Sequence, residues 1–245
     1  MIYHRIVMCF LVDDGVFLGE GTFSKVFLVP YLGGSAVVKM SKRKKDQYMK
    51  NEVGILSYLN RYDIGPKIIA RSVGEYPTIL MEFVGFRTLR DVLKSRDFSH
   101  VELVCIFIDI AEVLMNIHDK GIVHNDLKHN NIVIRDKRNA GQKWIDIIDY
   151  GLACRKGEIV GFDLQEDEAP WLAPEVKRGE ASFPASDIYS YGALLQPLYD
   201  ALDENAMISV LISLTKQRDP ELRMSANYII NFLGSVKEDL LSQTR

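Results

Sequence analysis

The residues that point most directly to chemistry lie in one short polar stretch of the chain. Asp126, Lys128 and Asn131 follow one another between the apolar runs Ile122–Val123 and Ile132–Ile134. An aspartate can accept a hydroxyl proton, a lysine can neutralise charge on a phosphoryl group during transfer, and an asparagine oxygen can bind a hard cation. Because strand-like segments hold the backbone on both sides, a loop between them can fix such side chains. This pattern indicates phosphoryl transfer.

A second acidic residue follows another apolar run. Asp149 comes after Ile147–Ile148 and stands before Gly151. Mg²⁺ prefers oxygen ligands and is often shared between carboxylates and substrate phosphates. We therefore expect Asn131 and Asp149 to be metal ligands. Two ordinary aspartate-containing turns are the alternative, but they would have to reproduce several independent spacings by coincidence.

Nearer the N-terminus, a glycine-containing turn precedes a lysine. Gly19 and Gly21 lie between strand-like runs, where glycines bring backbone N–H groups close to phosphate oxygens. Ser24 replaces the third glycine of the usual pattern, so the turn alone also fits an ordinary hairpin. Lys39 ends an apolar strand, and Glu52 could pair with its buried charge. A lysine that reaches the surface is the alternative, but the turn and Glu52 together favour a phosphate anchor.

Two kinds of element must position these residues. Up to about residue 85, β-branched and aromatic runs punctuated by glycine predict strands, with one helix near 45–58. Leu103–His118 has apolar residues at helical spacing, and Ser99 with Glu102 predicts a capping box at its start. Further helices are expected over 187–202, 207–215 and 226–233.

Composition argues against several classes of protein. The 245 residues include 30 basic and 33 acidic side chains, a net charge of -3, which does not suit a nucleic-acid binder or an anionic-membrane binder. The three cysteines contain no CxxC pair and suit a reducing compartment rather than a disulfide framework or zinc site. The apolar opening Met1–Val12 is too short to span a membrane and has no small-residue cleavage site, which favours a strand. We expect a cytoplasmic protein, and the composition does not exclude a nuclear location.

Taken together, the motifs resemble the eukaryotic protein kinase superfamily. The matching segments are His124–Asn125–Asp126 for H-R-D, Asp126 to Asn131 for D-L-K-x-x-N, Asp149–Tyr150–Gly151 for D-F-G, Ala173–Pro174–Glu175 for A-P-E, Asp187–Gly192 for the D-x-W-S-x-G helix, and Asp219–Arg223 for the segment whose arginine pairs with the A-P-E glutamate. The resemblance runs from about Gly15 to Leu233 with every motif in order. It implies an α+β, bilobal protein-kinase-like fold of the serine/threonine type. The small lobe, 1–84, would hold an antiparallel sheet with one main helix, and the lobe 85–245 would be mainly helical.

The resemblance also implies roles for particular residues. Lys39 would bind the α- and β-phosphates of ATP and pair with Glu52. Asp126 would be the catalytic base and Lys128 would contact the γ-phosphoryl group. Asn131 and Asp149 would hold Mg²⁺. The residues implied in binding the rest of ATP are Leu18, Gly19, Glu20, Gly21, Thr22, Phe23, Ser24, Lys25, Val26, Val37, Met81 as gatekeeper, Glu82, Val84 and Val133.

Two departures from the family pattern concern regulation. Asn125 replaces the arginine that reads a phosphorylated activation loop in many kinases, and an uncharged amide cannot form the charge-assisted pair with phosphate. The segment Leu152–Leu172 contains no serine, threonine or tyrosine. Both observations predict a kinase that is not switched on by phosphorylation of this segment.

A third departure is an acidic run, Gln165–Glu168, before Trp171. Glu168 stands where serine/threonine kinases commonly carry a threonine that contacts Asp126 and Lys128. Three interpretations stay open: Glu168 pairs with Lys128 and holds it off the phosphate, it attracts a basic substrate, or the run is a solvated acidic loop.

The expected partners are ATP and a protein substrate, without nucleic acid or membrane, and the expected state is a monomer. Two alternatives belong to other classes. A pseudokinase scaffold usually lacks the anchor lysine, the base or the metal-binding aspartate, and all three are present here. Small-molecule kinases share the H-x-D motif but lack the A-P-E segment and the lysine two residues after the base.

Overall fold

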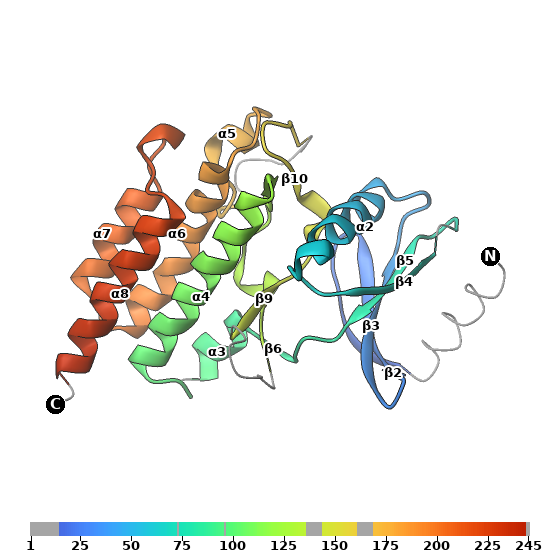
Figure 1. The fold of residues 1–245 in the computed structure, drawn as a ribbon, viewed down its shortest axis with the longest axis horizontal. Helices are drawn as coiled ribbons and strands as arrows, with labels where there is room; N and C mark the ends of the chain where they lie inside the picture. Colours follow the sequence, from blue (N-terminus) through green and yellow to red (C-terminus); the bar gives the residue numbers. More distant parts are fainter. Residues whose placement is uncertain (1–14, 73, 96, 136–143, 161–168, 244–245) are drawn as a thin grey trace. The chain divides into compact units, whose positions relative to one another are not determined.

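The computed structural model describes residues 15–72, 74–95, 97–135, 144–160 and 169–243. The chain divides into two compact units at the boundary between Val84 and Gly85. The first unit is a sheet with one long helix, and the second is mainly helical (Figure 1). The predicted α+β fold, with a strand-rich part before a helical one, is confirmed. The strand expected within Met1–Val12 lies outside the described residues.

Unit 1 is built on an antiparallel sheet. Its strands are β1 (Val16–Glu20), β2 (Ser24–Tyr31), β3 (Gly34–Ser41), β4 (Ile68–Ser72) and β5 (Thr78–Glu82), and its helical segments are α2 (Gln47–Leu59) and the 3-10 turn η1 (Asn60–Tyr62). The strands lie in the order β1-β2-β3-β5-β4, so β3 is central. In this register Lys39 lies opposite Val26 on one side and Ile79 on the other.

The two faces of β3 pack in different clusters. Ala36 and Val38 are fully buried in one apolar cluster, whereas Val37 packs against the other, which contains Met49 of α2. Successive side chains of a strand point to opposite faces, and every second one shares a face. Lys39 therefore points to the same face as Val37, the face that α2 covers.

Helix α2 begins where the sequence indicates. Asp46 is its N-cap, and the Asp46 side chain accepts hydrogen bonds from the N–H groups of Tyr48 and Met49. Such a cap satisfies donors that have no partner inside the helix. Glu52 lies on the buried face of α2. The helix predicted near 45–58 is confirmed.

Unit 2 combines long helices with short strands. The helices are α3 (Leu89–Ser95), α4 (His100–Asp119), α5 (Pro174–Lys177), α6 (Pro184–Ala201), α7 (Ala206–Thr215) and α8 (Ala226–Gln243). The strands are β6 (Arg87–Thr88), β7 (Ile122–Val123), β8 (Ile132–Ile134), β9 (Ile145–Ile147) and β10 (Cys154–Arg155). The 3-10 turns are η2 (His129–Asn131), η3 (Tyr150–Leu152) and η4 (Pro220–Leu222). Helix α4 packs against α8, and α6 packs against α7 (Figure 1). Ile106, Phe107 and Ile110 of α4 are fully buried, which makes α4 the centre of this unit.

The start of α4 has the predicted capping box. The Ser99 hydroxyl accepts from the Glu102 N–H, while the Glu102 carboxylate accepts from the Ser99 N–H at 2.9 Å. These bonds satisfy two backbone donors at the first turn. The hydrogen bonds from Ser99 lower the pKa of Glu102 below its ordinary value.

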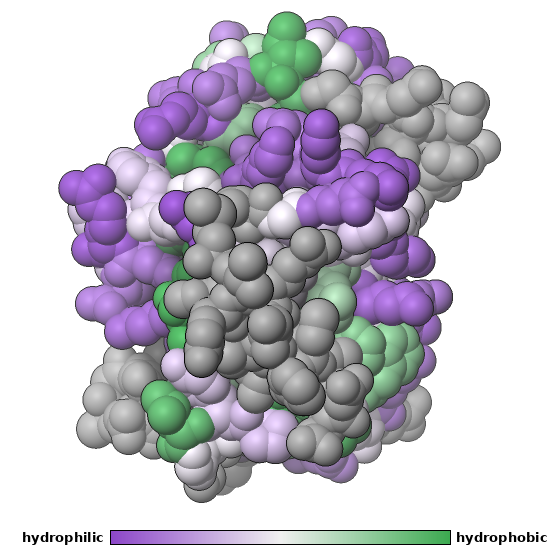
Figure 2. Space-filling view, turned by 90° about the vertical axis from the view of Figure 1, so that its right-hand side faces the viewer, coloured by the Kyte–Doolittle hydropathy of each residue, from purple (hydrophilic) through white to green (hydrophobic). Residues whose placement is uncertain are grey.

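None of the helices in the described ranges has both the length and the apolar character that crossing a bilayer requires. On the face seen in Figure 2, hydrophilic residues cover most of the coloured surface and apolar residues form small separate groups. In β1, three apolar residues in a row, Val16, Phe17 and Leu18, are exposed.

Candidate active site

The strand pair β8–β9 brings the two predicted metal ligands together. Ile132 of β8 pairs with Ile147 of β9 in an antiparallel register. Asn131 directly precedes β8, and Asp149 follows β9 after one residue, so both leave the pair at the same end. The Ile148 N–H donates to the Asn131 carbonyl oxygen at 2.9 Å and fixes this end.

The donor atoms fit Mg²⁺ shared with phosphates. Asn131 Nδ2 donates to the carbonyl oxygen of Asp126 at 2.8 Å and to its Oδ2 at 2.9 Å, which leaves the Oδ1 of Asn131 as the atom for a metal. Asp149 has a left-handed backbone conformation, φ 66°. Among the described residues, no three His, Cys, Asp or Glu side chains form a metal-binding group. Mg²⁺ commonly takes one or two protein ligands and completes its shell with phosphates and waters.

Three donors hold the Asp126 carboxylate. Lys128 Nζ lies 2.7 Å and Asn131 Nδ2 2.9 Å from Oδ2, and Trp171 Nε1 lies 3.0 Å from Oδ1. Asp126 is buried. The structure thus brings together the three residues that the sequence singles out, and it adds Trp171, for which the sequence predicts no role. The one feature of the sequence that could have indicated this contact is the indole N–H donor of Trp171, two residues before the A-P-E segment.

A buried carboxylate of α6 fixes the backbone of this loop. Asp187 accepts hydrogen bonds from the N–H groups of His124 and Asn125 at 2.7 and 2.8 Å, and its Oδ2 lies 2.9 Å from Nε2 of His118. Burial on its own would raise the pKa of Asp187, but the hydrogen bond and charge of His118 and the His124 N–H lower it below its ordinary value. The loop is therefore held by an ionised side chain from a separate element.

Asn125 connects the loop to the following segment. Its Nδ2 donates to the Leu152 carbonyl oxygen at 3.3 Å and to Cys154 Sγ at 3.2 Å, and its Oδ1 accepts from the Ser182 hydroxyl at 2.5 Å. Burial raises the pKa of the Cys154 thiol to about 11, so the thiol is neutral. The neutral amide thus has a structural role where many kinases carry an arginine.

A buried ion pair anchors the A-P-E segment. Arg223 Nη1 lies 2.6 Å from Glu175 Oε1, and Arg223 Nη2 lies 2.8 Å from Oε2. Burial alone would raise the pKa of Glu175, but the hydrogen bonds and charge of Arg223 lower it below its ordinary value. The two residues that the resemblance pairs are brought together.

In unit 1, Lys39 and Glu52 form a close ion pair. Lys39 Nζ lies 2.7 Å from Glu52 Oε2 and 3.0 Å from Oε1. Their side chains are only 11% and 3% exposed. The alternative of a lysine that reaches the surface is wrong, because the alternation of β3 directs Lys39 toward α2.

The glycine turn between β1 and β2 leaves room beside its backbone. A Cβ atom added at Gly19 or Gly21 would meet nothing within 4 Å. The turn is closed by the Gly21 N–H, which donates to the Ser24 carbonyl oxygen at 3.0 Å. The Phe23 ring stacks on Tyr48 of α2 at 4.5 Å. An open backbone turn of this kind suits phosphate oxygens.

The remaining residues implied for ATP lie as follows. Met81 is buried in β5, Val84 follows it, and the Glu82 N–H donates to the Lys67 carbonyl oxygen at 2.8 Å. Within the described residues the Val84 N–H has no hydrogen-bond acceptor. In the turn and strands of unit 1 lie Leu18, Glu20, Thr22, Lys25, Val26 and Val37, whereas Val133 is buried in β8 of unit 2. Glu168 and the rest of its acidic run lie outside the described residues.

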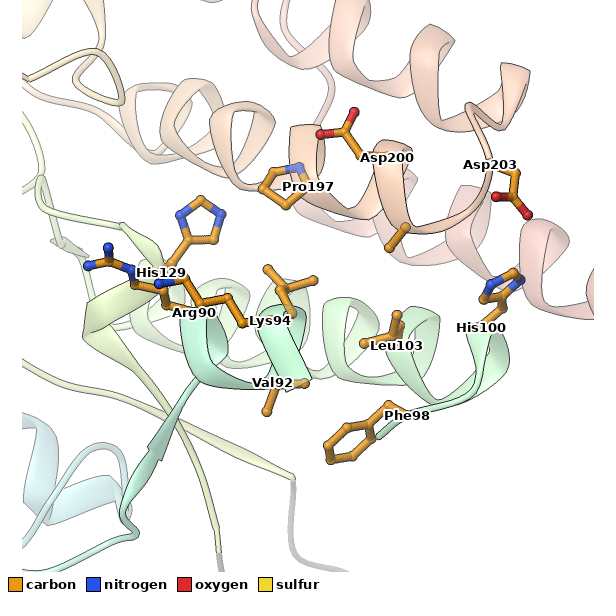
Figure 3. A pocket seen from close by; sticks show the side chains of 12 residues that line it. Arg90, Val92, Lys94, Phe98, His100, Leu103, His129, Pro197, Asp200 and Asp203 are labelled. Atoms are coloured by element: carbon orange, nitrogen blue, oxygen red, sulfur yellow. The ribbon is translucent and has the colours of Figure 1, made fainter. Parts of the chain in front are cut away.

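Two hollows in unit 2 adjoin the catalytic loop, residues 124–131, which contains Asp126, and both are lined by His129. The first, of about 590 Å³, carries Arg90 and Lys94 near His129 at one end and Asp203 at the other (Figure 3). The second, of about 340 Å³, is lined by Lys128 and Trp171 together with side chains of α6 and α7. Burial lowers the pKa of His129. Since the first hollow has opposite charges at its two ends, it selects no single sign of ligand charge.

Comparison with known proteins agrees with this geometry. The protein kinase domain family matches residues 12–209. A probable serine/threonine-protein kinase of Dictyostelium discoideum is 26% identical over 253 residues, which cover 89% of this chain and 27% of that protein. Mitogen-activated protein kinase kinase kinase 17 of Arabidopsis thaliana is 32% identical over 192 residues, 74% of this chain and 50% of that protein.

A third relative, the serine/threonine/tyrosine-protein kinase HT1 of Arabidopsis thaliana, is 25% identical over 195 residues, 75% of this chain and 49% of that protein. The chain thus spans half or less of the length of these relatives. The family match covers most of the chain, and the motifs from Gly19 to Gly192 lie within it, whereas Asp219–Arg223 lies beyond its end. The chain belongs to the protein kinase domain family.

Proposed function

We propose that this chain transfers the γ-phosphoryl group of ATP to serine or threonine hydroxyls of a protein substrate. The observation that carries the proposal is the Asp126 carboxylate, which is held by Lys128, Trp171 and the candidate metal ligand Asn131. A buried, oriented carboxylate next to a lysine and an asparagine is the arrangement that phosphoryl transfer to a hydroxyl requires.

The proposal gives each residue one task. Asp126 accepts the proton of the substrate hydroxyl as the hydroxyl oxygen attacks the γ-phosphorus. The bond from that phosphorus to the bridging oxygen breaks, and ADP leaves with the electron pair. Lys128 neutralises charge on the transferred group, and Lys39, oriented by Glu52, binds the α- and β-phosphates. Mg²⁺, held by Asn131 and Asp149, would supply charge neutralisation on the phosphates.

The acceptor class is supported by Lys128 and by the names of the relatives. A lysine two residues after the base favours serine and threonine. The Dictyostelium discoideum relative above is a probable serine/threonine-protein kinase by name, whereas HT1 also carries tyrosine in its name. The test is phosphoamino-acid analysis of mixed peptides after incubation with labelled ATP and Mg²⁺. Phosphoserine or phosphothreonine is expected, and label found only on tyrosine would contradict the acceptor class.

The same experiment separates the two other classes. A scaffold that only binds ATP would label no acceptor, and a small-molecule kinase would label an aminoglycoside or choline-type acceptor but no peptide. Removal of Mg²⁺ by a chelator is expected to abolish labelling of the peptides. Labelling that persists without a divalent cation would contradict the assignment of Asn131 and Asp149.

The proposal includes activity without phosphorylation of Leu152–Leu172. Asn125 supports this part, because its amide holds Leu152 and Cys154 next to the catalytic loop through neutral hydrogen bonds. Ser182 completes the same network from beyond the A-P-E segment. These contacts need no added charge, so the described part of the segment has an anchor that does not depend on phosphate.

A further inference from the structure

The two oxygens of the Asp126 carboxylate have different surroundings. Oδ2 accepts from Lys128 Nζ at 2.7 Å and from Asn131 Nδ2 at 2.9 Å, whereas Oδ1 accepts only from Trp171 Nε1 at 3.0 Å among the described residues. An ionised carboxylate offers about four acceptor sites, about two on each oxygen. Oδ2 is therefore filled, and Oδ1 keeps one site for a substrate hydroxyl.

Trp171 also contacts the second catalytic side chain. Lys128 Nζ lies over the Trp171 ring, 5.1 Å from its centroid. A cation over the face of an indole is attracted by the ring. One side chain thus contacts both Asp126 and Lys128.

The backbone around Trp171 is well anchored. Leu172 and Ala173 are buried in an apolar cluster against which the Trp171 ring packs. The Leu172 N–H donates to the Ala169 carbonyl oxygen at 3.0 Å, which closes a turn before the ring. The indole N–H is therefore directed at Asp126 from a fixed support.

We propose that Trp171 is a positioning residue for phosphoryl transfer, which orients Asp126 so that its Oδ1 receives the substrate proton. The proposal rests on the proposed function. Indole nitrogen is a donor only, so Trp171 cannot itself take the proton. Its N–H fixes the rotation of the carboxylate, and its ring face holds Lys128 beside the same group.

Trp171→Phe removes the hydrogen-bond donor and leaves a smaller aromatic ring at this position. Phenylalanine keeps an aromatic face for Lys128 and removes the N–H donor. Since a hydrogen bond to a charged group is worth about a 10- to 100-fold change in rate, kcat is expected to fall by about that factor. KM for ATP is expected to stay within about twofold, because Asp126 does not bind the nucleotide. Trp144→Phe is the matched control, expected to leave kcat unchanged, since Trp144 packs edge-on to Phe98, which precedes α4.

An isostere guards against a folding defect in Trp171→Phe. In the Trp144→Phe variant, Trp171 is the single tryptophan. When this variant is produced in tryptophan-auxotrophic cells supplied with benzothienylalanine, the analogue replaces Trp171, and a sulfur atom takes the place of the N–H while the ring size is kept. The same fall in kcat is expected. Unchanged kcat for both the isostere and Trp171→Phe would overturn the proposal, and so would a rise in kcat, since Trp171 would then obstruct Oδ1.

The outcomes separate this proposal from the proposed function. Wild-type protein that transfers no phosphate to any peptide would overturn both. Active wild-type protein with no effect of either change at Trp171 would overturn the positioning role alone. A fall in kcat with unchanged KM for ATP supports it, whereas a loss confined to KM for ATP would contradict it.

Discussion

Asn125 connects the catalytic loop to the segment that follows Asp149 through an uncharged side chain. Its backbone is left-handed, φ 61°, a conformation that asparagine tolerates better than most residues. Its amide donates to Leu152 and Cys154 and accepts from Ser182, so both ends of the group are used. The contacts with Cys154 and Ser182 are buried and the contact with Leu152 is partly buried, which makes the chemistry of the amide important for stability.

Asn125→Asp is expected to destabilise the protein. The carboxylate loses the Nδ2 donor and places a buried charge beside the Leu152 carbonyl oxygen. An unsatisfied buried group costs about 1–3 kcal/mol, so the free energy of unfolding should fall by about that amount in urea denaturation. Asn130→Asp is the control, because Asn130 is exposed and should tolerate the same chemical change. Equal stability of both variants would contradict the role of the amide.

The ion pair of Glu175 and Arg223 gives a pH dependence. The pKa of Glu175 is lowered in the folded state from its ordinary value of 4.5. A lowered pKa means that the pair stabilises the fold fully above that value and that this contribution is lost as the pH falls through the folded-state pKa. The free energy of unfolding should therefore decline below about pH 4.5. Glu175→Gln should make this decline with pH smaller, whereas Glu221→Gln, a change at an exposed position, should leave the decline as in the wild type. If the unfolding free energy of the two variants falls equally steeply with pH, the role of the ion pair is contradicted.

At the scale of elements, the close packing of α6 on α7 depends on a glycine. A Cβ atom added at Gly192 would collide with the Thr215 hydroxyl and lie 2.7 Å from Lys216 Cγ. In α8, a Cβ added at Gly234 would meet nothing within 4 Å. The two glycines therefore make opposite predictions for the same substitution.

Gly192→Ala should destabilise the protein by about 1–3 kcal/mol through overpacking, in spite of the better helix propensity of alanine. Gly234→Ala should stabilise it by about 0.5–1 kcal/mol, because only the propensity changes. Thermal or urea unfolding of the two variants checks both signs. If Gly192→Ala stabilises the protein, α6 and α7 are not packed closely enough for a Cβ atom at position 192 to collide with Thr215.

Long helices with a recognisable N-cap could be predicted from the sequence, whereas short helices could not. The Ser99–Glu102 capping box and the apolar spacing after it predict α4 within a few residues. Helices α3 and α5 are too short to show a period, and α5 has four residues. Helix α8 continues to Gln243, beyond the predicted end at 233. Its last buried apolar residue is Val236, and because the positions that follow are mainly polar, the sequence pattern does not show this last part of the helix.

At the scale of the whole molecule, motif order predicts which residues belong to the site but not all of their contacts. Lys39 with Glu52 and Asn131 with Asp149 follow from strand alternation and from one strand pair. Trp171 reaches Asp126 across 45 positions, and such a contact is set by tertiary packing that no local pattern encodes. The position of Glu168 relative to Lys128 stays a prediction.

Under the proposed function, phosphoryl transfer is expected without phosphorylation of Leu152–Leu172, which contains no hydroxyl side chain. Protein made in bacteria and treated with phosphatase should be as active toward a peptide as an untreated sample, within about twofold. The measurement is the initial rate with labelled ATP, and mass spectrometry confirms removal of phosphate. A large loss on dephosphorylation would contradict the account.

The central claim is tested most directly by the rate of phosphoryl transfer from ATP to a serine peptide in wild-type protein and Asp126→Asn. A positioned general base contributes about 100- to 10,000-fold, so Asp126→Asn should lose activity by at least that order. Asp119→Asn, the same change at an exposed position at the end of α4, should keep the wild-type rate. Wild-type protein without transfer, or Asp126→Asn as active as Asp119→Asn, would contradict the assignment of Asp126.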